Sequence, residues 1–346
     1  MKHQTTRYGE IPFYKIGTFG NTADAFISKK LFLEYKTKYS FPKKGDILIS
    51  AFGTIGRAVI YDGKPAYFQD SNIVWIDNDE TLVKNDFLFY AYSNVKWNTE
   101  HTTILRLYND NFRNTLIPLP PLNEQNAIAN ILSALDRYLC TLDALILKKE
   151  GVKKSLSFEL LSQRKRLKGF NQAWQRVRLG DIANYLTSNL SAEQITQQGK
   201  IKVYDVNNFI GYTDTTFISD KPYISIVKDG SVGRVRILPP KTNILSTMGA
   251  LIANHKTTTE FLFYLLSNFD FKNFTSGSII PHIYFKDYKE KTIFLPPLNE
   301  QIAIADILSA LDKEITSLKN KKRQFENIKK ALNHDLMSAK IRVLKK

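Results

Sequence analysis

The chain carries the phrase Leu-Pro-Pro-Leu-Asn-Glu-Gln at residues 119–125 and again at residues 295–301. The identity resumes further on, because residues 131–136 and 307–312 both read Ile-Leu-Ser-Ala-Leu-Asp. Solenoid repeats recur every 20–50 residues or so, which is at most roughly a quarter of the sequence separation between these two phrases. The sequence therefore predicts one large structural unit that is used twice.

Each phrase predicts the start of a helix. Its two prolines stop a helix that arrives from upstream, and they favour an extended approach. Asn123 and Asn299 then stand where an N-cap side chain is expected. Glu124 and Glu300 follow in the first turn, where a carboxylate meets the positive end of the helix dipole.

Beyond each phrase the apolar residues recur at steps of three and four, which is the pattern of a coiled-coil seam. The first seam is expected at Ile128, Ile131, Leu135, Tyr138, Leu142, Leu145, Val152 and Leu156. The second is expected at Ile304, Ile307, Leu311, Leu318, Phe325, Ile328 and Leu332. The positions expected to hold the two helices together are Leu135, Leu142, Leu311 and Leu318. Lys149, Glu314 and Lys321 interrupt the seams and predict imperfect packing.

A basic run that ends at Gly169 predicts the end of the first helix, because glycine suits the position after a helix and cations suit its last turn. A continuous helix from Asn123 to Lys168 would be about 60–70 Å long. Such a seam needs a partner, and the long segment between the copies permits an antiparallel pair. The alternative, a coiled coil that serves only as an oligomerisation stalk, leaves two large globular segments unexplained.

The chain is expected to divide into four segments: a first globular domain over residues 1–121, a helix over 122–169, a second globular domain over 170–297 and a helix over 298–346. The predicted fold class is α+β, with two mixed α/β globular domains separated by two long antiparallel coiled-coil helices in a pseudo-two-fold internal repeat. The globular domains share a plan, since Gly-Thr-Ile-Gly-Arg at residues 53–57 is answered by Gly-Ser-Val-Gly-Arg at residues 230–234.

The first domain is expected to form strands over residues 11–16, 47–50, 58–61 and 73–76, a helix over residues 85–93 and a polar loop over residues 99–111. The second domain opens with Trp-Gln-Arg-Val-Arg-Leu-Gly-Asp-Ile at residues 174–182, for which the first domain has no counterpart. The first domain is therefore expected to be smaller than the second, or to depend on the C-terminal tail for its closure.

The net charge is +16, and the excess of basic residues is spread over all four segments. A folded protein that is basic throughout indicates a polyanionic partner, most often a nucleic acid. A basic protein that is merely soluble is the alternative.

The chain has one cysteine, Cys140, so no internal disulfide can form, and a small buried residue is expected there. Residues 1–7 hold no apolar signal segment, and no stretch is apolar enough to cross a bilayer. A cytoplasmic protein without a membrane partner is expected.

These features resemble the specificity subunit of a type I restriction–modification system, and the resemblance covers essentially the whole chain. It is carried by the two Pro-Pro-Leu-Asn-Glu-Gln phrases, the long helix predicted after each, the Leu-Gly-Asp-Ile opening at residues 179–182 and the two Gly-x-x-Gly-Arg turns. The missing opening of the first domain departs from the family pattern.

The resemblance implies a DNA specificity subunit that is not itself catalytic. Each of two target-recognition domains would read one half of a split sequence in double-stranded DNA, with the antiparallel helices holding the domains apart. Two methyltransferase subunits would dock on the helices, and a restriction and translocase subunit would join them. No cofactor is expected on this chain, because S-adenosylmethionine, ATP and Mg²⁺ would belong to the partner subunits.

Reading DNA requires side chains that reach base edges, with Lys and Arg on phosphates to position them. In the first domain the candidates follow the glycine turn, lie in the polar loop or precede a strand: Arg57, Arg106, Tyr108, Lys43 and Lys44. In the second they are Arg234, Arg236, His282, Tyr284 and Lys286, with Lys241 as a phosphate contact. The alternative for the glycines is a hairpin turn that serves only the fold.

Catalytic motifs are scarce. The sequence lacks the Gly-rich phosphate loop of ATPases, and its five histidines and one cysteine are too scattered to form a zinc site by local spacing. Asp24, Glu34 and Lys36 match the acidic-x-Lys pattern of metal-dependent nucleases only loosely. A self-sufficient DNA-modifying enzyme or nuclease with an unrecognised site at these residues is therefore the alternative function.

Overall fold

The computed structural model describes residues 4–68, 72–97 and 105–344, so residues 1–3 and the first part of the expected polar loop lie outside the described residues. The chain divides into two compact units. Unit 1 comprises Met1–Asp143 and Asn320–Lys346, and unit 2 comprises Ala144–Lys319. Each unit thus contains one globular part together with half of each long helix, α4 (Leu122–Leu161) and α7 (Leu298–Met337).

The globular part of unit 1 mixes strands and helices. Its elements are β1 (Ile11–Tyr14), β2 (Ala25–Ile27), α1 (Lys29–Lys38), β3 (Ile47–Ser50), β4 (Ala58–Ile60), β5 (Tyr67–Phe68), β6 (Ile73–Trp75), α2 (Asn85–Tyr92) and α3 (Asn109–Arg113). They form two three-stranded sheets with the orders β2-β1-β5 and β4-β3-β6. The strand expected over residues 47–50 is confirmed, and its four residues are all buried.

The globular part of unit 2 follows the same plan with additions. Its elements are β7 (Gln175–Arg178), η2 (Leu179–Asp181), β8 (Ala183–Thr187), η3 (Ala192–Gln194), β9 (Ile201–Tyr204), β10 (Phe209–Thr213), β11 (Tyr223–Val227), β12 (Val235–Leu238), β13 (Thr242–Ile244), β14 (Met248–Ala253), α5 (Thr259–Ser267), η4 (Lys272–Phe274), β15 (Thr275–Ser276), β16 (His282–Ile283), α6 (Phe285–Tyr288) and β17 (Thr292–Leu295). The sheets have the orders β10-β9-β13, β12-β11-β14-β8, β17-β7 and β15-β16.

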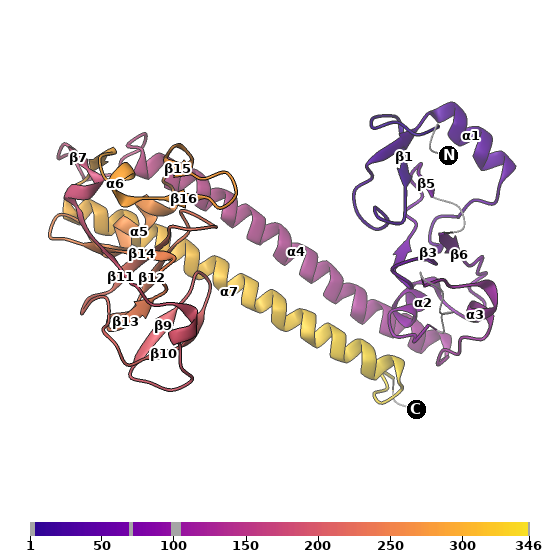
Figure 1. The fold of residues 1–346 in the computed structure, drawn as a ribbon. Coiled ribbons are helices and arrows are strands. Elements are labelled where there is room, and N and C mark those ends of the chain that lie inside the picture. The colour runs from indigo at the N-terminus through magenta and orange to yellow at the C-terminus, as the bar shows by residue number, and fades with distance from the viewer. Residues whose placement is uncertain (1–3, 69–71, 98–104, 345–346) are drawn as a thin grey trace. The chain divides into compact units, whose positions relative to one another are not determined.

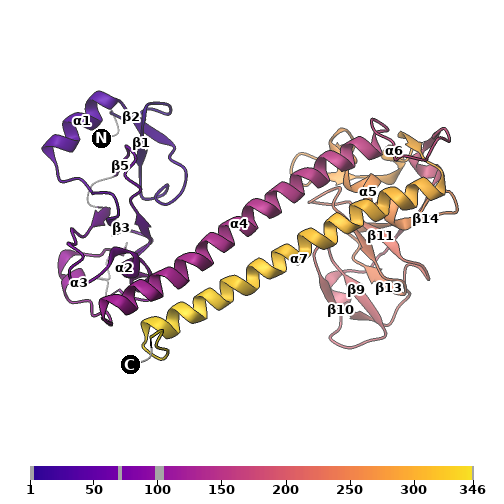
Figure 2. The same ribbon diagram turned by 180° about the vertical axis from the view of Figure 1, so that it is seen from behind.

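The predicted fold class is confirmed, since mixed α/β globular parts accompany two long helices that pack together (Figures 1 and 2). In unit 1 the first half of α4 lies against the last half of α7, and in unit 2 the last half of α4 lies against the first half of α7. The helices therefore run antiparallel in each unit. Oppositely charged side chains join them, including Lys149–Glu314 at 2.8 Å in unit 2 and Lys322–Asp143 at 2.6 Å in unit 1.

Several positions of the expected seam are wrong. Ile131, Val152 and Ile328 are exposed, whereas the buried positions include Leu132, Ile146, Leu308 and Ile315. The buried face of each helix is displaced because the seam also meets the globular part: Leu132 shares one cluster with Phe87 of α2. Leu142 is buried, and Leu135, Leu311 and Leu318 are half-buried. Cys140, expected to be buried, is also exposed, because it lies on the outer side of α4.

The helix ends also differ from the prediction. α4 ends at Leu161 rather than near Gly169, because Gln163 adopts the left-handed φ of 62° and the chain then turns back. α7 ends at Met337, two residues before Ala339 with its φ of 55°. Neither asparagine is an N-cap, since both helices begin one residue earlier and the Pro121 and Pro297 carbonyls accept the first amide hydrogen bonds.

The repeated phrase ties each helix to its globular part through one buried glutamine. In unit 1 the Gln125 amide donates to the Leu82 and Pro120 carbonyls at 2.9 and 2.8 Å and accepts from the Lys84 N–H. In unit 2 Gln301 makes the equivalent set of contacts with Lys256, Pro296 and Thr258. A buried amide with all these partners satisfied fixes the loop to the helix.

The glutamate of the phrase is also buried, and an arginine that follows the opposite helix neutralises it. In unit 2 Arg166 donates to both Glu300 oxygens, at 3.2 and 2.6 Å. In unit 1 Arg342 makes the same bidentate contact with Glu124, donating to both carboxylate oxygens. The residues after α7 therefore pack against unit 1 through this ion pair.

The Glu124–Arg342 ion pair makes the stability of unit 1 depend on pH. The hydrogen bond from Arg342 lowers the pKa of Glu124 below its ordinary value of 4.5. Since the folded pKa is the lower one, the pair stabilises unit 1 above about pH 4.5 and loses this contribution as the pH falls through the folded value. In the wild-type chain, the protection of unit 1 amides should fall more steeply on acidification than in the Glu124→Gln variant, whose side chain cannot titrate. Hydrogen exchange at a series of pH values measures the opening free energy of unit 1 in both chains. An equal dependence on pH in the two chains would contradict the prediction.

Candidate functional site

A glycine turn links two strands in the sheet of each unit. In unit 1 it joins β3 to β4, with φ values of 67° at Gly53 and 81° at Gly56. In unit 2 it joins β11 to β12, with 82° at Gly230 and 80° at Gly233. A Cβ at Gly233 would lie 2.6 Å from the Phe271 ring. The turns therefore require glycine for the fold, whatever else they contact.

A second segment runs beside each turn and places the candidate side chains next to it. In unit 1 the Gly53 N–H donates to the Leu105 carbonyl at 3.1 Å, and an antiparallel bridge pairs Phe52 with Arg106. The Arg106 guanidinium lies 5.0 Å from the centre of the Phe52 ring. Arg106 is exposed, as is Tyr108 two residues on. We call Phe52, Arg106 and Tyr108 the turn surface of unit 1.

The same backbone arrangement in unit 2 carries different chemistry. Gly230 N–H donates to the Pro281 carbonyl at 2.9 Å, and the bridge pairs Asp229 with His282. His282 Nδ1 lies 2.6 Å from the Asp229 carboxylate. Tyr284 is exposed, and the Lys286 ammonium lies 5.5 Å from its ring centre. Asp229, His282 and Tyr284 form the turn surface of unit 2. The repeat offset places Arg106 and His282 at equivalent positions, and likewise Tyr108 and Tyr284.

The arginines next to the glycine turns contact the protein itself. Arg57 donates to the Phe19 carbonyl at 2.9 Å. Arg234 donates to the Asn207 side chain at 2.8 Å, and Arg236 donates to the Asn207 carbonyl at 2.9 Å while lying over the Tyr204 ring. These contacts hold the guanidinium groups in place and leave some of their other N–H donors for a ligand.

Three of the four candidate lysines lie at the other ends of the strands. Lys43 and Lys44 precede β3, whereas the glycine turn follows it, and Lys43 pairs with Asp77 at 3.0 Å. Lys241 follows β12, whereas the turn precedes that strand. The structure therefore brings Arg106 and Tyr108 together in unit 1, and His282, Tyr284 and Lys286 in unit 2, but it places these three lysines elsewhere.

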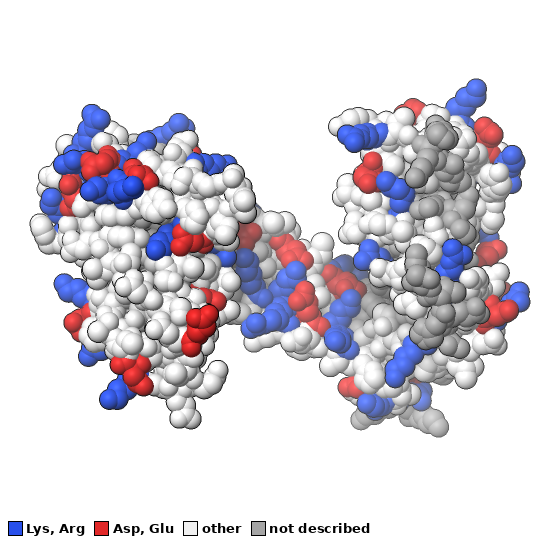
Figure 3. Space-filling model, viewed as in Figure 1, with Lys and Arg blue, Asp and Glu red and all other residues white. Residues whose placement is uncertain are grey.

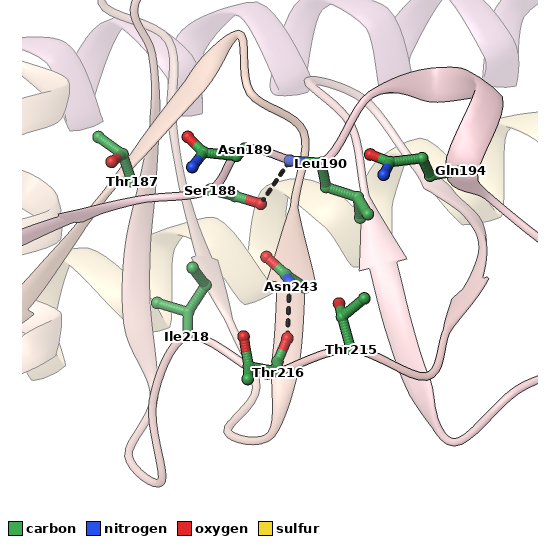
Figure 4. Close-up of a pocket in the computed structure, with 9 residues that line it drawn as sticks. All are labelled: Thr187, Ser188, Asn189, Leu190, Gln194, Thr215, Thr216, Ile218 and Asn243. Atoms are coloured by element: carbon green, nitrogen blue, oxygen red, sulfur yellow. Dashed lines mark hydrogen bonds between the residues drawn. The ribbon is translucent and has the colours of Figure 1, made fainter.

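Unit 2 also contains a polar pocket of about 300 Å³ that the sequence reading missed (Figure 4). Its lining residues are uncharged: Thr187, Ser188, Asn189, Leu190, Gln194, Thr215, Thr216, Ile218 and Asn243. Asn243 is fixed by donating to the Thr216 carbonyl at 2.6 Å, whereas Asn189 and Gln194 are exposed. Amide groups of this kind both donate and accept hydrogen bonds, as base edges require. The polar residues that follow β8 in the sequence were the feature that could have predicted this pocket.

The nuclease-like residues contact other groups. Asp24 pairs with Lys15 at 2.8 Å, and the Lys36 ammonium lies 5.4 Å from the centre of the Phe41 ring. Within the described residues, no group of three or more His, Cys, Asp or Glu side chains could hold a metal ion. Every helix in the described part of the chain is too short or too polar to span a membrane.

Basic side chains are spread over the molecule. On the face shown in Figure 3, Lys and Arg lie over both units, and along the helix pair they alternate with Asp and Glu. Two units with one backbone plan and different exposed side chains define a duplicated recognition protein built around paired helices. A family model described as the type I restriction modification DNA specificity domain matches residues 1–149 and 171–327. The chain belongs to this family of type I restriction–modification specificity subunits, which are non-catalytic.

Relatives agree with this assignment. The chain is 62% identical over 137 residues to a protein of Haemophilus influenzae named as a type I restriction enzyme specificity subunit. The aligned stretch covers 39% of this chain and 36% of that protein. The chain thus spans about a third of the length of that relative. Over 335 residues it is 29% identical to the MjaX specificity subunit named in Methanocaldococcus jannaschii, covering 86% of this chain and 79% of that one.

Solved structures show the same fold. The S subunit of the type I restriction–modification system from M. genitalium matches with a TM-score of 0.64 at 20% sequence identity, over 97% of this chain and 91% of that one. A chain from a structure of a type I restriction–modification system matches with a TM-score of 0.53 at 16% identity, over 85% and 82% of the two chains.

Proposed function

We propose that this chain reads a bipartite sequence in double-stranded DNA, with one half-site bound by each unit, for a type I restriction–modification complex. Arg106 and Tyr108 of unit 1, and His282, Tyr284 and Lys286 of unit 2, reach the DNA. Arg57, Arg234 and Arg236 position it, and Lys43, Lys44 and Lys241 contact phosphates at the margins. The net charge of +16 favours such a polyanion.

One observation carries the two-half-site proposal: the equivalent bridge in the two units pairs Phe52 with Arg106 in one and Asp229 with His282 in the other. Arginine favours guanine in the major groove, because its fork meets two acceptors. A histidine next to a carboxylate has a different set of donors and acceptors. Two units with the same backbone arrangement and different side chains at the bridge are suited to read different bases.

Two methyltransferase subunits would dock on the helix pair, and a restriction subunit would join the assembly. Val152 of α4 and Ile328 of α7 occupy equivalent positions in the repeat, and both are exposed. Two equivalent exposed positions, one on each long helix, suit two copies of the same partner. S-adenosylmethionine, ATP and Mg²⁺ would be bound by these partners.

The half-site proposal is tested with Arg106→Ala and His282→Ala in the chain reconstituted with its methyltransferase. Losing a base-edge contact costs about 1–3 kcal/mol, or roughly 5- to 150-fold in discrimination. Arg106→Ala should relax the reading of one half-site and His282→Ala that of the other. Methylation of DNA libraries randomised in one half-site at a time measures this.

The exposed Lys256, outside the turn surface of unit 2, gives a matched control as Lys256→Ala, which should leave both half-sites unchanged. If either turn-surface variant relaxed both half-sites equally, the assignment of one half-site to each unit would fail. The chain alone, incubated with DNA, S-adenosylmethionine and Mg²⁺, should neither methylate nor cut. Activity without the partner would support the self-sufficient enzyme instead.

A further inference from the structure

The backbone of His282, on the turn surface of unit 2, is held from both sides. On one side His282 lies in β16 and pairs with Ser276 of β15. On the other side a bridge joins His282 to Asp229, and the Ile283 N–H donates to the Lys228 carbonyl at 2.9 Å. The side chain of His282 therefore starts from a fixed position in the fold.

The imidazole ring of His282 is fixed as well. Its Nδ1 lies 2.6 Å from the Asp229 carboxylate. The hairpin between β15 and β16 approaches the ring at Gly277, whose φ is 90°. A Cβ at Gly277 would lie 3.1 Å from the ring carbon Cδ2 and 2.3 Å from the Ile280 carbonyl oxygen. The hairpin and the carboxylate together set the direction of the ring.

The carboxylate determines which ring nitrogen carries the hydrogen. An ionised carboxylate only accepts hydrogen bonds, so its contact with His282 requires a hydrogen on Nδ1. A neutral imidazole has a single N–H, and its other nitrogen is then an acceptor. Among the described residues Nε2 has no hydrogen-bond partner, and the side chain is 36% exposed. The neutral ring therefore offers an acceptor to a ligand at Nε2.

The Asp229 carboxylate has few other demands on it. Within the part of the chain that the structure describes, its ion pair with His282 is the only one that it forms. The phenol of Tyr185 lies nearby and stays neutral, because burial raises its pKa and the charge of Asp229 adds to this effect. Unit 1 has Phe52 and Arg106 at the equivalent bridge, and a guanidinium can only donate. The histidine–carboxylate pair therefore gives unit 2 a hydrogen-bonding character that unit 1 lacks at this bridge.

We propose that Asp229 is a positioning residue that sets which base unit 2 reads, because it holds His282 in the Nδ1–H tautomer and leaves Nε2 to accept a hydrogen bond from an exocyclic amino group. In the major groove these amino groups are N6 of adenine and N4 of cytosine. The inference rests on the proposed function, since it specifies one contact within the half-site of unit 2. Arg106 donates to its base, whereas His282 accepts from its own.

Asp229→Asn should reverse the polarity of this contact. An amide in place of the carboxylate of a histidine–aspartate pair gives the other tautomer, with the hydrogen on Nε2. Nε2 then requires an acceptor, and guanine O6 and thymine O4 stand where adenine and cytosine carry their amino groups. One position of the unit 2 half-site should change from A·T to G·C, or from C·G to T·A, and the preference should reverse by at least about fivefold.

Methylation of DNA libraries randomised in the half-site of unit 2 measures this change, with the chain reconstituted with its methyltransferase. Asp229→Ala is the second variant, because it removes the acceptor and adds no donor. It should relax the same position so that both base pairs are modified. Asp220→Asn is the matched control: it makes the same chemical change at an exposed aspartate that precedes β11, whereas the glycine turn follows that strand. The control should leave the half-site unchanged.

The tautomer is also measured directly, by nitrogen NMR of the isotope-labelled full chain at about pH 8. The shifts of the two ring nitrogens distinguish the neutral tautomers from each other and from the imidazolium, and His282→Ala identifies the signals of this ring. The hydrogen should be on Nδ1 in the native chain and in Asp220→Asn, and on Nε2 in Asp229→Asn. A purely structural role for Asp229 would not move the hydrogen between the nitrogens.

The two measurements separate this inference from the proposed function. If His282→Ala relaxes the half-site of unit 2 while the native ring carries its hydrogen on Nε2, or is an imidazolium, the inference is overturned and the proposed function stands. If Asp229→Asn moves the hydrogen to Nε2 but neither Asp229→Asn nor His282→Ala alters the half-site, His282 does not read DNA, and both are overturned.

Discussion

Glu300→Ala should destabilise unit 2 by about 3–5 kcal/mol, the cost of removing one partner from a buried ion pair. The Glu300 carboxylate is fully buried and binds both the Arg166 guanidinium and the Trp174 indole. Without it, the buried indole N–H loses its acceptor, and the guanidinium, whose side chain is 27% exposed, loses its counter-charge and is left with the Gln172 carbonyl at 2.8 Å. Native-state hydrogen exchange measures the opening free energy of unit 2 separately from that of unit 1.

Glu124→Ala is the matched control, because it removes the same residue of the repeated phrase from unit 1. Its partner Arg342 has a side chain that is 51% exposed, so water can solvate the arginine once the carboxylate is gone. The loss in unit 1 should therefore be clearly smaller than the loss in unit 2. Equal losses would contradict this expectation, because they would mean that the burial of the arginine does not set the energy of the pair.

The repeat and the helix pair could be predicted because their signals are local or periodic. The prolines, the apolar steps and the duplicated phrase each act within a few turns of helix, and the strand over residues 47–50 is a short apolar run between turns. The role of the phrase could not be predicted in the same way. Gln125 and Glu124 bind partners 41 and 218 residues away, and no local pattern encodes such distances.

The errors in the seam have one physical cause. A heptad pattern predicts which face of a helix is apolar, but it does not predict how many other elements pack against that face. Here α2 and α5 also pack on the long helices, and Tyr90 and Tyr264 hydrogen-bond to Asp136 and Asp312 on them. The buried face is therefore displaced, and Val152 and Ile328 are exposed.

The candidate site could be predicted in part. The glycine turns and the segments that follow the helices of the globular parts were visible as a repeated pattern, and the bridges at Arg106 and His282 bring the two together. Which exposed side chains meet could not be derived, because the bridges join residues more than fifty positions apart in sequence. The charge of a lysine does not tell which end of a strand it occupies. For this reason the sequence could not separate the site from the three lysines at the opposite strand ends, Lys43, Lys44 and Lys241.

Inserting one heptad into each long helix should change the spacing of the DNA target and leave both half-sites unchanged. If the helix pair sets the distance between the half-sites, seven added residues lengthen it by about 10 Å, or about three base pairs. A heptad keeps the apolar face within roughly 20° of its original direction. The insertions belong after Asp143 in α4 and after Lys319 in α7, which are the last residues before the unit boundary on each helix.

Both insertions are needed because the ion pairs on either side of the boundary must stay in register. Lys322 pairs with Asp143 in unit 1, and Lys319 pairs with Glu150 in unit 2. With both helices lengthened these pairs re-form, whereas a heptad in α4 alone displaces one helix against the other. The single insertion is thus the control, and it should lose both stability and methylation.

The methylome of a host that expresses the doubly extended chain with its methyltransferase gives the result directly. Modified sites should keep both half-sites and gain about three base pairs between them, with methylation at the original spacing lost. Because the turn surfaces are untouched, any change within a half-site would mean that the helices affect base reading as well as distance. A doubly extended chain that folds and still modifies only the original spacing would show that something other than the helix pair sets it.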